Sequence, residues 1–147
     1  ENVEILLGNN HSVVIDAIDQ VRAKAAMIAF CRRIKTPIIV AGAAGGQMDP
    51  TQIRIGDLSQ TVQDPLLAKV RALLRREHGF PRDTKTKFKI SAVFSTEQLR
   101  YPENNISCDS EHGPAGLNCA GFGSSVCVTS AFGMAAAAHA IKLIVAP

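Results

Sequence analysis

The stretch VVIDAID at residues 13–19 decides the fold that this sequence predicts. It is an apolar, β-branched run that ends in the carboxylate of Asp19, and a helical pattern begins directly after it. Buried parallel strands have such apolar runs, and open α/β sheets bind ligands beyond the carboxyl ends of their strands. We therefore expect a strand over residues 13–18 that delivers Asp19 to a nucleotide site.

Two interpretations of Asp19 remain open at this point. A carboxylate at the end of a parallel strand can bind Mg²⁺ or a ribose hydroxyl. It can equally serve as the N-cap of the helix expected over residues 20–35. Arg22 and Lys24 fall near the first turn of that helix, where the helix dipole disfavours cations. They suit an acidic neighbour or a bound anion, although a solvated helix face explains them as well.

A second buried strand is expected over residues 37–41, which read PIIVA. Together with the first strand and the intervening helix it forms a parallel βαβ unit. The glycine-rich loop Gly42–Gly46 leaves this strand at the same edge as Asp19 and allows backbone to approach a ligand closely. The loop lacks the G-K-[ST] of a Walker A motif, and the chain has no G-x-G-x-x-G, so the loop alone is a weak signal.

The rest of the chain supplies two further strands and two helices. A half-exposed strand is expected over residues 51–55 and another over 90–94. Asp64 and Pro65 have the pattern of an N-cap and first helical residue. The buried stripe of this helix is expected to contain Leu66, Val70, Leu73 and Leu74.

From Ala120 onward the only charged side chain is Lys142, which predicts a long C-terminal helix. Its length would suffice to span a bilayer, but serine, threonine, histidine and alanine dilute its hydrophobicity. We expect a buried or subunit-interface helix and no stable membrane insertion. Cys31 and Cys127 lie on helical patterns and are expected in the core.

The composition indicates a globular domain with an anionic partner. The 147 residues are 46% hydrophobic and 20% charged, and the four cysteines form no C-x-x-C pair that would favour structural zinc. Residues 69–89 hold eight of the 16 Lys and Arg against two acidic residues. This basic segment could contact phosphates, including those of RNA, or be merely solvated. Its candidate contacts are Arg71, Arg75, Arg76, Lys85, Lys87 and Lys89.

Cys119 is the candidate catalytic thiol. It lies between residues 102–118, a stretch rich in Pro, Asn, Ser and Gly that we expect to be mobile, and a glycine-rich helix start. Such a setting lowers the pKa of a thiol, although burial as a structural cysteine is the commoner fate.

Several blocks of the sequence together resemble the ThiF/MoeB/HesA family, relatives of the ubiquitin-activating enzymes. VVIDAID is similar to the strand of that family that carries its Mg-ATP aspartate. Further similar blocks are VRAKAA at 21–26, GGQMDPTQI at 45–53, QDPL at 63–66, VFSTE at 93–97 and NCAGFG at 118–123. They cover nearly the whole chain, and the blocks at 47–53 and 93–97 are typical of a branch that acts on tRNA.

The resemblance implies an α/β fold, the C-terminal part of a Rossmann-like doubly wound sheet plus a long C-terminal helix. Residues 1–147 would form a single, incomplete ThiF-like domain. Residues 1–80 would be a partial nucleotide-binding half, and residues 81–147 a substrate and dimer region. The family's glycine-rich ATP loop has no counterpart in this sequence, so we expect the isolated chain to be inactive and to bind ATP poorly.

The resemblance also implies an activity. Members of the branch use ATP and Mg²⁺ to activate the carboxylate of threonylcarbamoyladenosine in tRNA, which then closes into a cyclic form. Asp19 matches the family position that handles Mg-ATP, and Cys119 matches a cysteine of the branch. Homodimers, a cysteine-desulfurase partner system and a cytoplasmic location are implied as well. An adenylyltransferase for a sulfur-carrier or ubiquitin-like protein, and a non-catalytic dimerisation or binding module, remain as alternatives.

Overall fold

A four-stranded mixed sheet forms the centre of the molecule. The computed structural model describes residues 2–8, 11–100 and 123–145. The strands are β1 (Val14–Asp16), β2 (Ile38–Ala41), β3 (Ile53–Asp57) and β4 (Ser91–Ser95), in the order β1-β2-β4-β3. β1, β2 and β4 are parallel, and β3 is an antiparallel edge strand. The expected α/β fold is confirmed.

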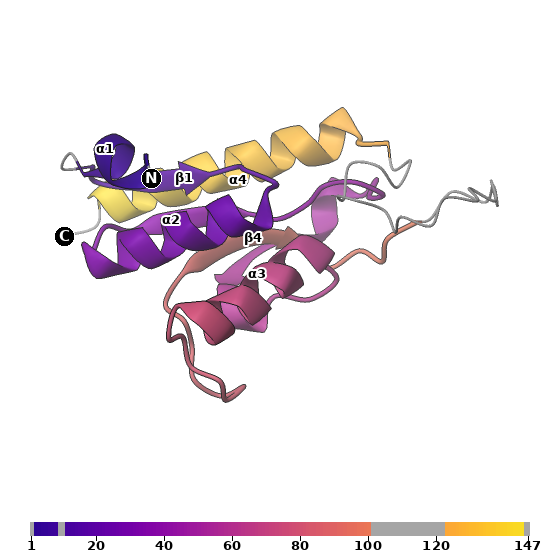
Figure 1. Ribbon diagram of the computed structural model, residues 1–147. Coiled ribbons are helices and arrows are strands. Elements are labelled where there is room, and N and C mark those ends of the chain that lie inside the picture. Colours follow the sequence, from indigo (N-terminus) through magenta and orange to yellow (C-terminus); the bar gives the residue numbers. More distant parts are fainter. Residues whose placement is uncertain (1, 9–10, 101–122, 146–147) are drawn as a thin grey trace.

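Helices cover both faces of this sheet. They are α1 (Val3–Leu7), α2 (Val21–Arg33), α3 (Pro65–Glu77) and α4 (Val126–Val145), with 3₁₀ turns at Pro50–Gln52 and Leu58–Gln60. Figure 1 shows α2 and α3 on one face of the sheet and α4 on the other. The long C-terminal helix predicted from the sequence is therefore present and packs as a separate layer.

The two faces carry two separate cores because side chains alternate along a strand. In β2, Ile38 and Val40 pack with α2 and α3, whereas Ile39 packs with α4. In β4, Ala92 and Phe94 join the first core and Val93 the second. Both central strands are thus apolar on both faces, which explains their continuous hydrophobic runs.

The first strand is shorter than residues 13–18. Asp16 ends it, because the Asp16 Oδ1 atom accepts a hydrogen bond of 2.9 Å from the Ile18 amide and turns the chain. The alternative that Asp19 is the N-cap of the next helix is wrong: Gln20 occupies the N-cap position, without a side-chain cap hydrogen bond. The parallel unit of β1, α2 and β2 is otherwise as predicted.

Of two other element boundaries, one differs from the prediction and one is confirmed. The edge strand begins at Ile53 instead of residue 51, because Asp49 caps a 3₁₀ turn by accepting from the Thr51 amide. The start of α3 is confirmed: Pro65 is its first residue and Asp64 caps it through the Leu67 amide. Its buried stripe is the expected one with Leu67 added.

Only one side of α4 is buried. Val128, Phe132, Ala136 and Ala140 recur every fourth residue and pack on the sheet. The outer side carries exposed apolar residues such as Val126 and Met134, each more than 70% exposed. α4 is therefore not a fully buried helix, which was one of the two expectations for this segment. By length and composition alone this helix could also cross a membrane, which is weak evidence because core helices pass the same test.

The two described cysteines differ in exposure. Cys31 is buried in α2 as expected, but Cys127 is exposed, so its expected place in the core is wrong. Burial also raises the pKa of the Cys31 thiol, with a further increase from the Asp16 carboxylate. Both effects make Cys31 the less reactive thiol, because the thiolate is the nucleophile.

Thiol labelling should separate these two cysteines. In a Cys108→Ser/Cys119→Ser variant, we expect Ellman's reagent to modify Cys127 within seconds to minutes and Cys31 only after denaturation. Absorbance would report about one reactive thiol per native chain and about two in denaturant. Two rapidly reacting thiols in the native variant would contradict the burial of Cys31.

Candidate functional site

A cavity of about 270 Å³ lies where the chain leaves the carboxyl ends of β1 and β2. Residues 17–19 after β1 and residues 42–45 after β2 line it, together with Pro65 and Leu66 at the start of α3. Leu99, Ser124 and Thr129 complete the lining. The sequence expectation that the glycine-rich loop meets Asp19 at one edge of the sheet is therefore met. This edge is the usual ligand site of open α/β sheets.

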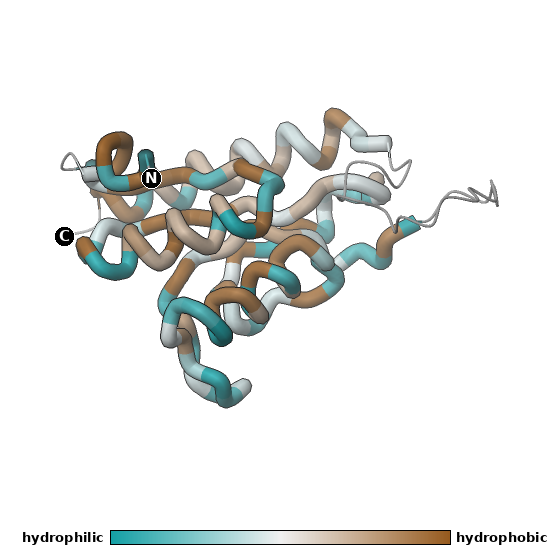
Figure 2. Tube along the Cα trace, in the orientation of Figure 1, coloured by the Kyte–Doolittle hydropathy of each residue, from teal (hydrophilic) through white to brown (hydrophobic). Residues whose placement is uncertain are grey.

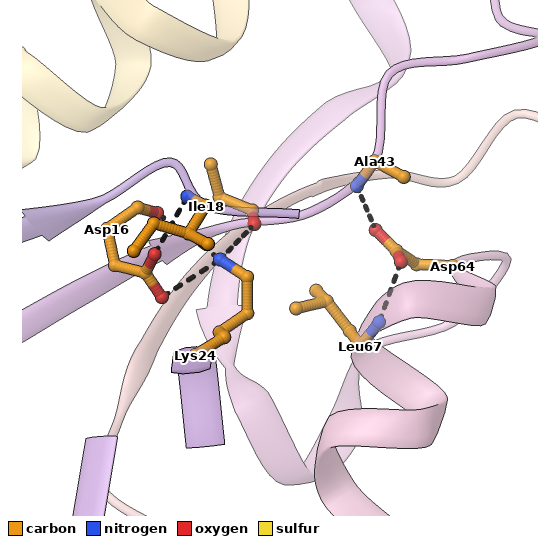
Figure 3. A network of polar contacts seen from close by, with 7 residues as sticks. Asp16, Ile18, Lys24, Ala43, Asp64 and Leu67 are labelled. Atoms are coloured by element: carbon orange, nitrogen blue, oxygen red, sulfur yellow. Dashed lines mark hydrogen bonds and ion pairs between the residues drawn. The ribbon is translucent and has the colours of Figure 1, made fainter. Parts of the chain in front are cut away.

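A fully buried lysine joins the ends of these two strands (Figure 3). The Lys24 Nζ atom donates to Asp16 Oδ2 at 2.9 Å and to the Ala41 carbonyl at 3.0 Å. A longer contact of 3.4 Å reaches the Asp16 carbonyl. These acceptors account for the three donors of an ammonium group. Lys24 thus ties β1, β2 and α2 together at the base of the site.

Burial and neighbouring charges act in opposite directions on the pKa of Lys24. Burial lowers the pKa of Lys24, while the charge of Asp16, its hydrogen bond to Lys24 and the charges of Asp64 and Asp19 act to raise it. An ion pair in so dry a place is stable only when its remaining hydrogen-bond capacity is also used. The carbonyl of Ala41 and the Ile18 amide fulfil that condition.

Asp64 fixes the glycine-rich loop to α3. Its Oδ2 accepts from the Ala43 amide at 3.0 Å, and its Oδ1 accepts from the Leu67 amide at 2.9 Å (Figure 3). Burial raises the pKa of Asp64, and the two amides together with Lys24 oppose that rise. Gly42 is required beside it, because a Cβ there would stand 1.9 Å from Asp64 Oδ2.

The sequence-predicted site residues are only partly brought together. Asp19 is exposed and lines the cavity. Lys24 has the acidic neighbour that the sequence left open, whereas Arg22 is exposed on α2. Cys119 lies outside the described residues. Within those residues, no group of three or more His, Cys, Asp or Glu could hold a metal ion.

The basic segment divides into anchoring and exposed residues. Arg71 donates to Thr61 Oγ1, while Arg75 donates to the Pro81 carbonyl at 3.1 Å and stacks on Phe88 at 5.0 Å. Arg76 is exposed and pairs with its neighbour Glu77. Lys85, Lys87 and Lys89 are exposed on the loop after α3, which Figure 2 shows as largely hydrophilic.

Asp57 holds the end of this basic loop in place. Its carboxylate accepts from Ser59 and from the amides of Phe88 and Lys89, at 2.9 Å and 2.7 Å for the two amides. Burial by itself would raise the pKa of Asp57, but these hydrogen bonds together lower it below its ordinary value. A carboxyl with a lowered pKa stabilises the fold above its unfolded pKa, and that contribution is lost as pH falls through the folded pKa.

Asp57→Asn should therefore reduce stability mainly at neutral pH. The new amide nitrogen would face the Lys89 N–H, and we expect the free energy of unfolding to fall by about 1 kcal/mol at pH 7, a small value because the carboxyl is partly solvated. Urea denaturation at pH 7 and pH 3 would show a smaller difference at the lower pH. Asp83→Asn, in a fully exposed turn, is the control; an equal loss at both pH values would contradict the assignment.

Sequence reasoning did not single out Asp16 and Asp64 as site residues. A signal was present, because Lys24 interrupts the buried stripe of α2 that contains Ala25 and Ile28. A lysine at a core position needs a buried partner of opposite charge. Which acid supplies it depends on how α2 lies on the sheet.

Comparisons with known proteins agree with this architecture, although no family model matches the chain. It is 49% identical over 142 residues to the tRNA threonylcarbamoyladenosine dehydratase of Haemophilus influenzae, covering 96% of this chain and 53% of that protein. The corresponding Escherichia coli protein is 46% identical over 151 residues, covering 99% of this chain and 56% of that one. The chain is therefore similar, over nearly its whole length, to tRNA threonylcarbamoyladenosine dehydratases.

A solved dehydratase has the same fold as this chain over the matched residues. The crystal structure of the E. coli dehydratase TcdA in complex with ATP matches with a TM-score of 0.83 and 45% identity. The match covers 99% of this chain and 52% of that one. This chain thus spans about half the length of the dehydratases it matches.

Proposed function

We propose that the chain supplies the Asp19 side of the ATP site of a tRNA threonylcarbamoyladenosine dehydratase. The observation that carries the proposal is the cavity where Asp19 meets the Gly42–Gly45 loop at the ends of two parallel strands. The likeness to a dehydratase solved with ATP supports a nucleotide as its ligand. The site would be completed by residues beyond those of this chain.

The described residues could hold Mg²⁺ only together with the phosphate groups of a nucleotide. Asp19 is the exposed carboxylate of the cavity, while Asp16 and Asp64 are buried and hydrogen-bonded within the protein. Mg²⁺ in nucleotide sites is commonly held by one or two carboxylates together with substrate phosphates and water. When bound there, the ion would neutralise charge on the phosphates as the nucleotide reacts.

The reaction needs a better leaving group than the substrate carboxylate provides. Transfer of a nucleotidyl group from ATP to the carboxylate of threonylcarbamoyladenosine would release pyrophosphate. Attack by a nucleophile of the same substrate then closes the ring and releases AMP, so that one water is lost from the nucleoside overall. In this scheme the chain holds and orients: Asp19 positions the cation, and Lys24 and Asp64 fix the strand ends and the loop.

The substrate RNA would contact the exposed part of the basic segment. Arg76, Lys85, Lys87 and Lys89 are exposed, whereas Arg71 donates to Thr61 and Arg75 anchors the loop through the Pro81 carbonyl. Phosphate contacts of this kind contribute affinity that falls with salt concentration. We propose that these four side chains position tRNA.

The outer face of α4 would contribute to a homodimer in the cytoplasm. It carries exposed apolar residues, and the tube of this helix in Figure 2 has few strongly hydrophilic positions. Apolar patches of this kind mark interaction surfaces. The cysteine-desulfurase partner system rests on the family resemblance alone.

A chimera tests the proposed ATP role of Asp19. The chain would replace the matching half of the E. coli dehydratase, and mass spectrometry would follow ATP-dependent loss of water from threonylcarbamoyladenosine in tRNA. We expect the chimera to be active and Asp19→Asn to lower kcat/KM by about tenfold to a hundredfold, since one charged ligand is worth roughly 1.4–2.7 kcal/mol here.

The control for this experiment is Glu4→Gln, which removes an exposed carboxylate on α1 that pairs with Arg33. It should leave kcat/KM unchanged. If Asp19→Asn kept full activity, Asp19 would not be part of the ATP site. A chimera that is folded but inactive would contradict the proposed function as a whole.

A further inference from the structure

A second pocket lies on the other side of the glycine-rich loop, next to the Asp19 cavity. It has a volume of about 340 Å³ and is lined by Gly46, Gln47, Met48, Arg100 and residues 123–125. Ser124 lines both pockets and forms an isolated β-bridge with Gly45, a lining residue of the Asp19 cavity.

Gln47 is the unusual residue of this pocket. It is only 1% exposed, yet neither its Nε2 nor its Oε1 atom has a hydrogen-bond partner within the described part of the chain. Buried polar atoms are almost always paired, and an unpaired one costs stability. The chain thus holds a buried amide, with its donor and acceptor both unused, at a pocket wall.

Glu97 does not itself line the pocket, but it adds an unused acceptor next to two lining residues, Met48 and Arg100. Its Oε2 accepts from the Met48 and Asp49 amides at 2.9 Å and 2.8 Å, which holds the carboxylate against the segment that carries Gln47. Its buried Oε1 has no hydrogen bond to any described residue. The exposed Arg100 approaches that oxygen to 3.7 Å, which is an ion pair beyond hydrogen-bond length.

Backbone contacts make this a built cluster instead of a chance gap. The Arg100 amide donates to the Gly46 carbonyl at 3.0 Å, and the Gly46 amide donates to the Gly123 carbonyl at 3.1 Å. Three segments that are far apart in sequence are therefore tied together around Gln47. The backbone of the pocket is thus held in place before any ligand arrives, which lowers the entropic cost of binding.

The unused groups define the chemistry of a ligand. Two oxygen acceptors call for N–H donors, and the Gln47 amide nitrogen calls for an acceptor. A simple cation would satisfy the oxygens but leave the amide N–H groups unpaired. An amide or ureido group offers both N–H donors and a carbonyl oxygen, and the guanidinium of Arg100 suits an adjoining carboxylate.

We propose that this pocket binds the ureido group of the substrate, with Gln47 of its lining and the neighbouring Glu97 as the hydrogen-bonding residues and Arg100 facing the substrate carboxylate. The assignment deepens the proposed dehydratase function and rests on it for the identity of the ureido compound. It places the carboxylate to be activated beside the Asp19 cavity.

Binding of N-carbamoyl-L-threonine to the chain tests the subsite, because this compound carries a ureido group and a carboxylate without nucleotide or RNA. Calorimetry should show saturable binding that Gln47→Met weakens at least tenfold, as expected for loss of buried hydrogen bonds to a ligand. Gln47→Met should also raise Tm, by about 4 °C, because it removes an unpaired buried amide from a domain of this size.

Gln52→Met is the matched control. Gln52 is a nearby glutamine whose Nε2 donates to Asp49 Oδ2 at 3.0 Å, so its replacement should lower Tm and leave binding of the compound unchanged. If Gln47→Met lowered Tm as Gln52→Met does, Gln47 would be a structural residue and the subsite would be wrong. Absence of saturable binding to the parent chain, or equal binding by Gln47→Met, would also overturn it.

Failure of the subsite can be told apart from failure of the proposed function. Suppose that the chimera turns over in an Asp19-dependent way, and that Gln47→Met leaves the KM for tRNA unchanged. This result would contradict the subsite alone. A chimera without turnover, combined with Gln47-dependent binding of N-carbamoyl-L-threonine, would contradict the dehydratase activity and leave the subsite standing.

Discussion

Replacing Lys24 with Met is expected to lower the free energy of unfolding by about 3–5 kcal/mol. The Lys24 ammonium is fully buried against Asp16, and its loss leaves that carboxylate in a dry place without a counter-charge. The Ala41 carbonyl loses its side-chain donor in the same step. Urea denaturation of the chain at pH 7, followed by circular dichroism, measures the difference.

A double variant separates charge from packing in this result. Lys24→Met/Asp16→Asn removes both charges and keeps an oxygen at position 16 for the Ile18 amide. We expect it to recover at least half of the lost stability, because a buried ion pair replaced by neutral groups of similar size is often tolerated. Equal stability of Lys24→Met and the parent chain would contradict the buried ion pair.

The consequences of Lys24→Met for function follow from its position between two strand ends. Asp19 lies three residues after Asp16, the last residue of β1. The glycine-rich loop begins directly after Ala41, the last residue of β2. Loosening both at once would misplace the two walls of the cavity. At a temperature where the chimera with Lys24→Met is still folded, we expect its kcat/KM to fall as well.

Gly42→Ala should have the second-largest effect, lowering the free energy of unfolding by about 2–4 kcal/mol. A Cβ at this position would stand 1.9 Å from Asp64 Oδ2 and 3.2 Å from Leu67 Cδ1. Asp64 cannot move aside without giving up the Ala43 amide, the Leu67 amide or both. The variant would therefore free the glycine-rich loop and uncap α3.

Gly133→Ala is the control for this prediction. Gly133 lies on the exposed side of α4, where an added Cβ would meet no described atom within 4 Å, so alanine should stabilise the helix by about 0.5–1 kcal/mol. Denaturation curves of both variants give the comparison. A Gly42→Ala protein as stable as Gly133→Ala would show that Asp64 is not held where the structure places it.

Local patterns were sufficient for much of the fold. The β-branched runs predicted two adjacent parallel strands, and the Asp-Pro pair at residues 64–65 predicted the start of α3. These features depend on neighbours in sequence: alternation, propensity and a cap that reaches three residues along the chain. The position of the glycine-rich loop beside Asp19 followed from strand direction alone.

The boundaries that sequence reasoning misplaced depend on competing local bonds. Asp16 ends β1 early by accepting from the Ile18 amide, and Asp49 diverts the start of β3 into a 3₁₀ turn. Short polar side chains offer the backbone alternatives to the sheet. Cys127 was misplaced for another reason, because an all-apolar helix does not reveal which of its faces meets the sheet.

The sequence by itself determined the α/β class, the order of strands and helices, and a carboxylate at the mouth of a strand-end site. Only the tertiary structure decided that Lys24 pairs with Asp16, that Asp64 holds the Gly42–Ala43 loop, and that Gln47 is buried without a partner among the described residues. The reason is physical. Strand and helix patterns are encoded within a few residues, whereas the partner of a buried charge or amide is set by how distant segments pack, and its cost or gain exists only in the dry interior that this packing creates.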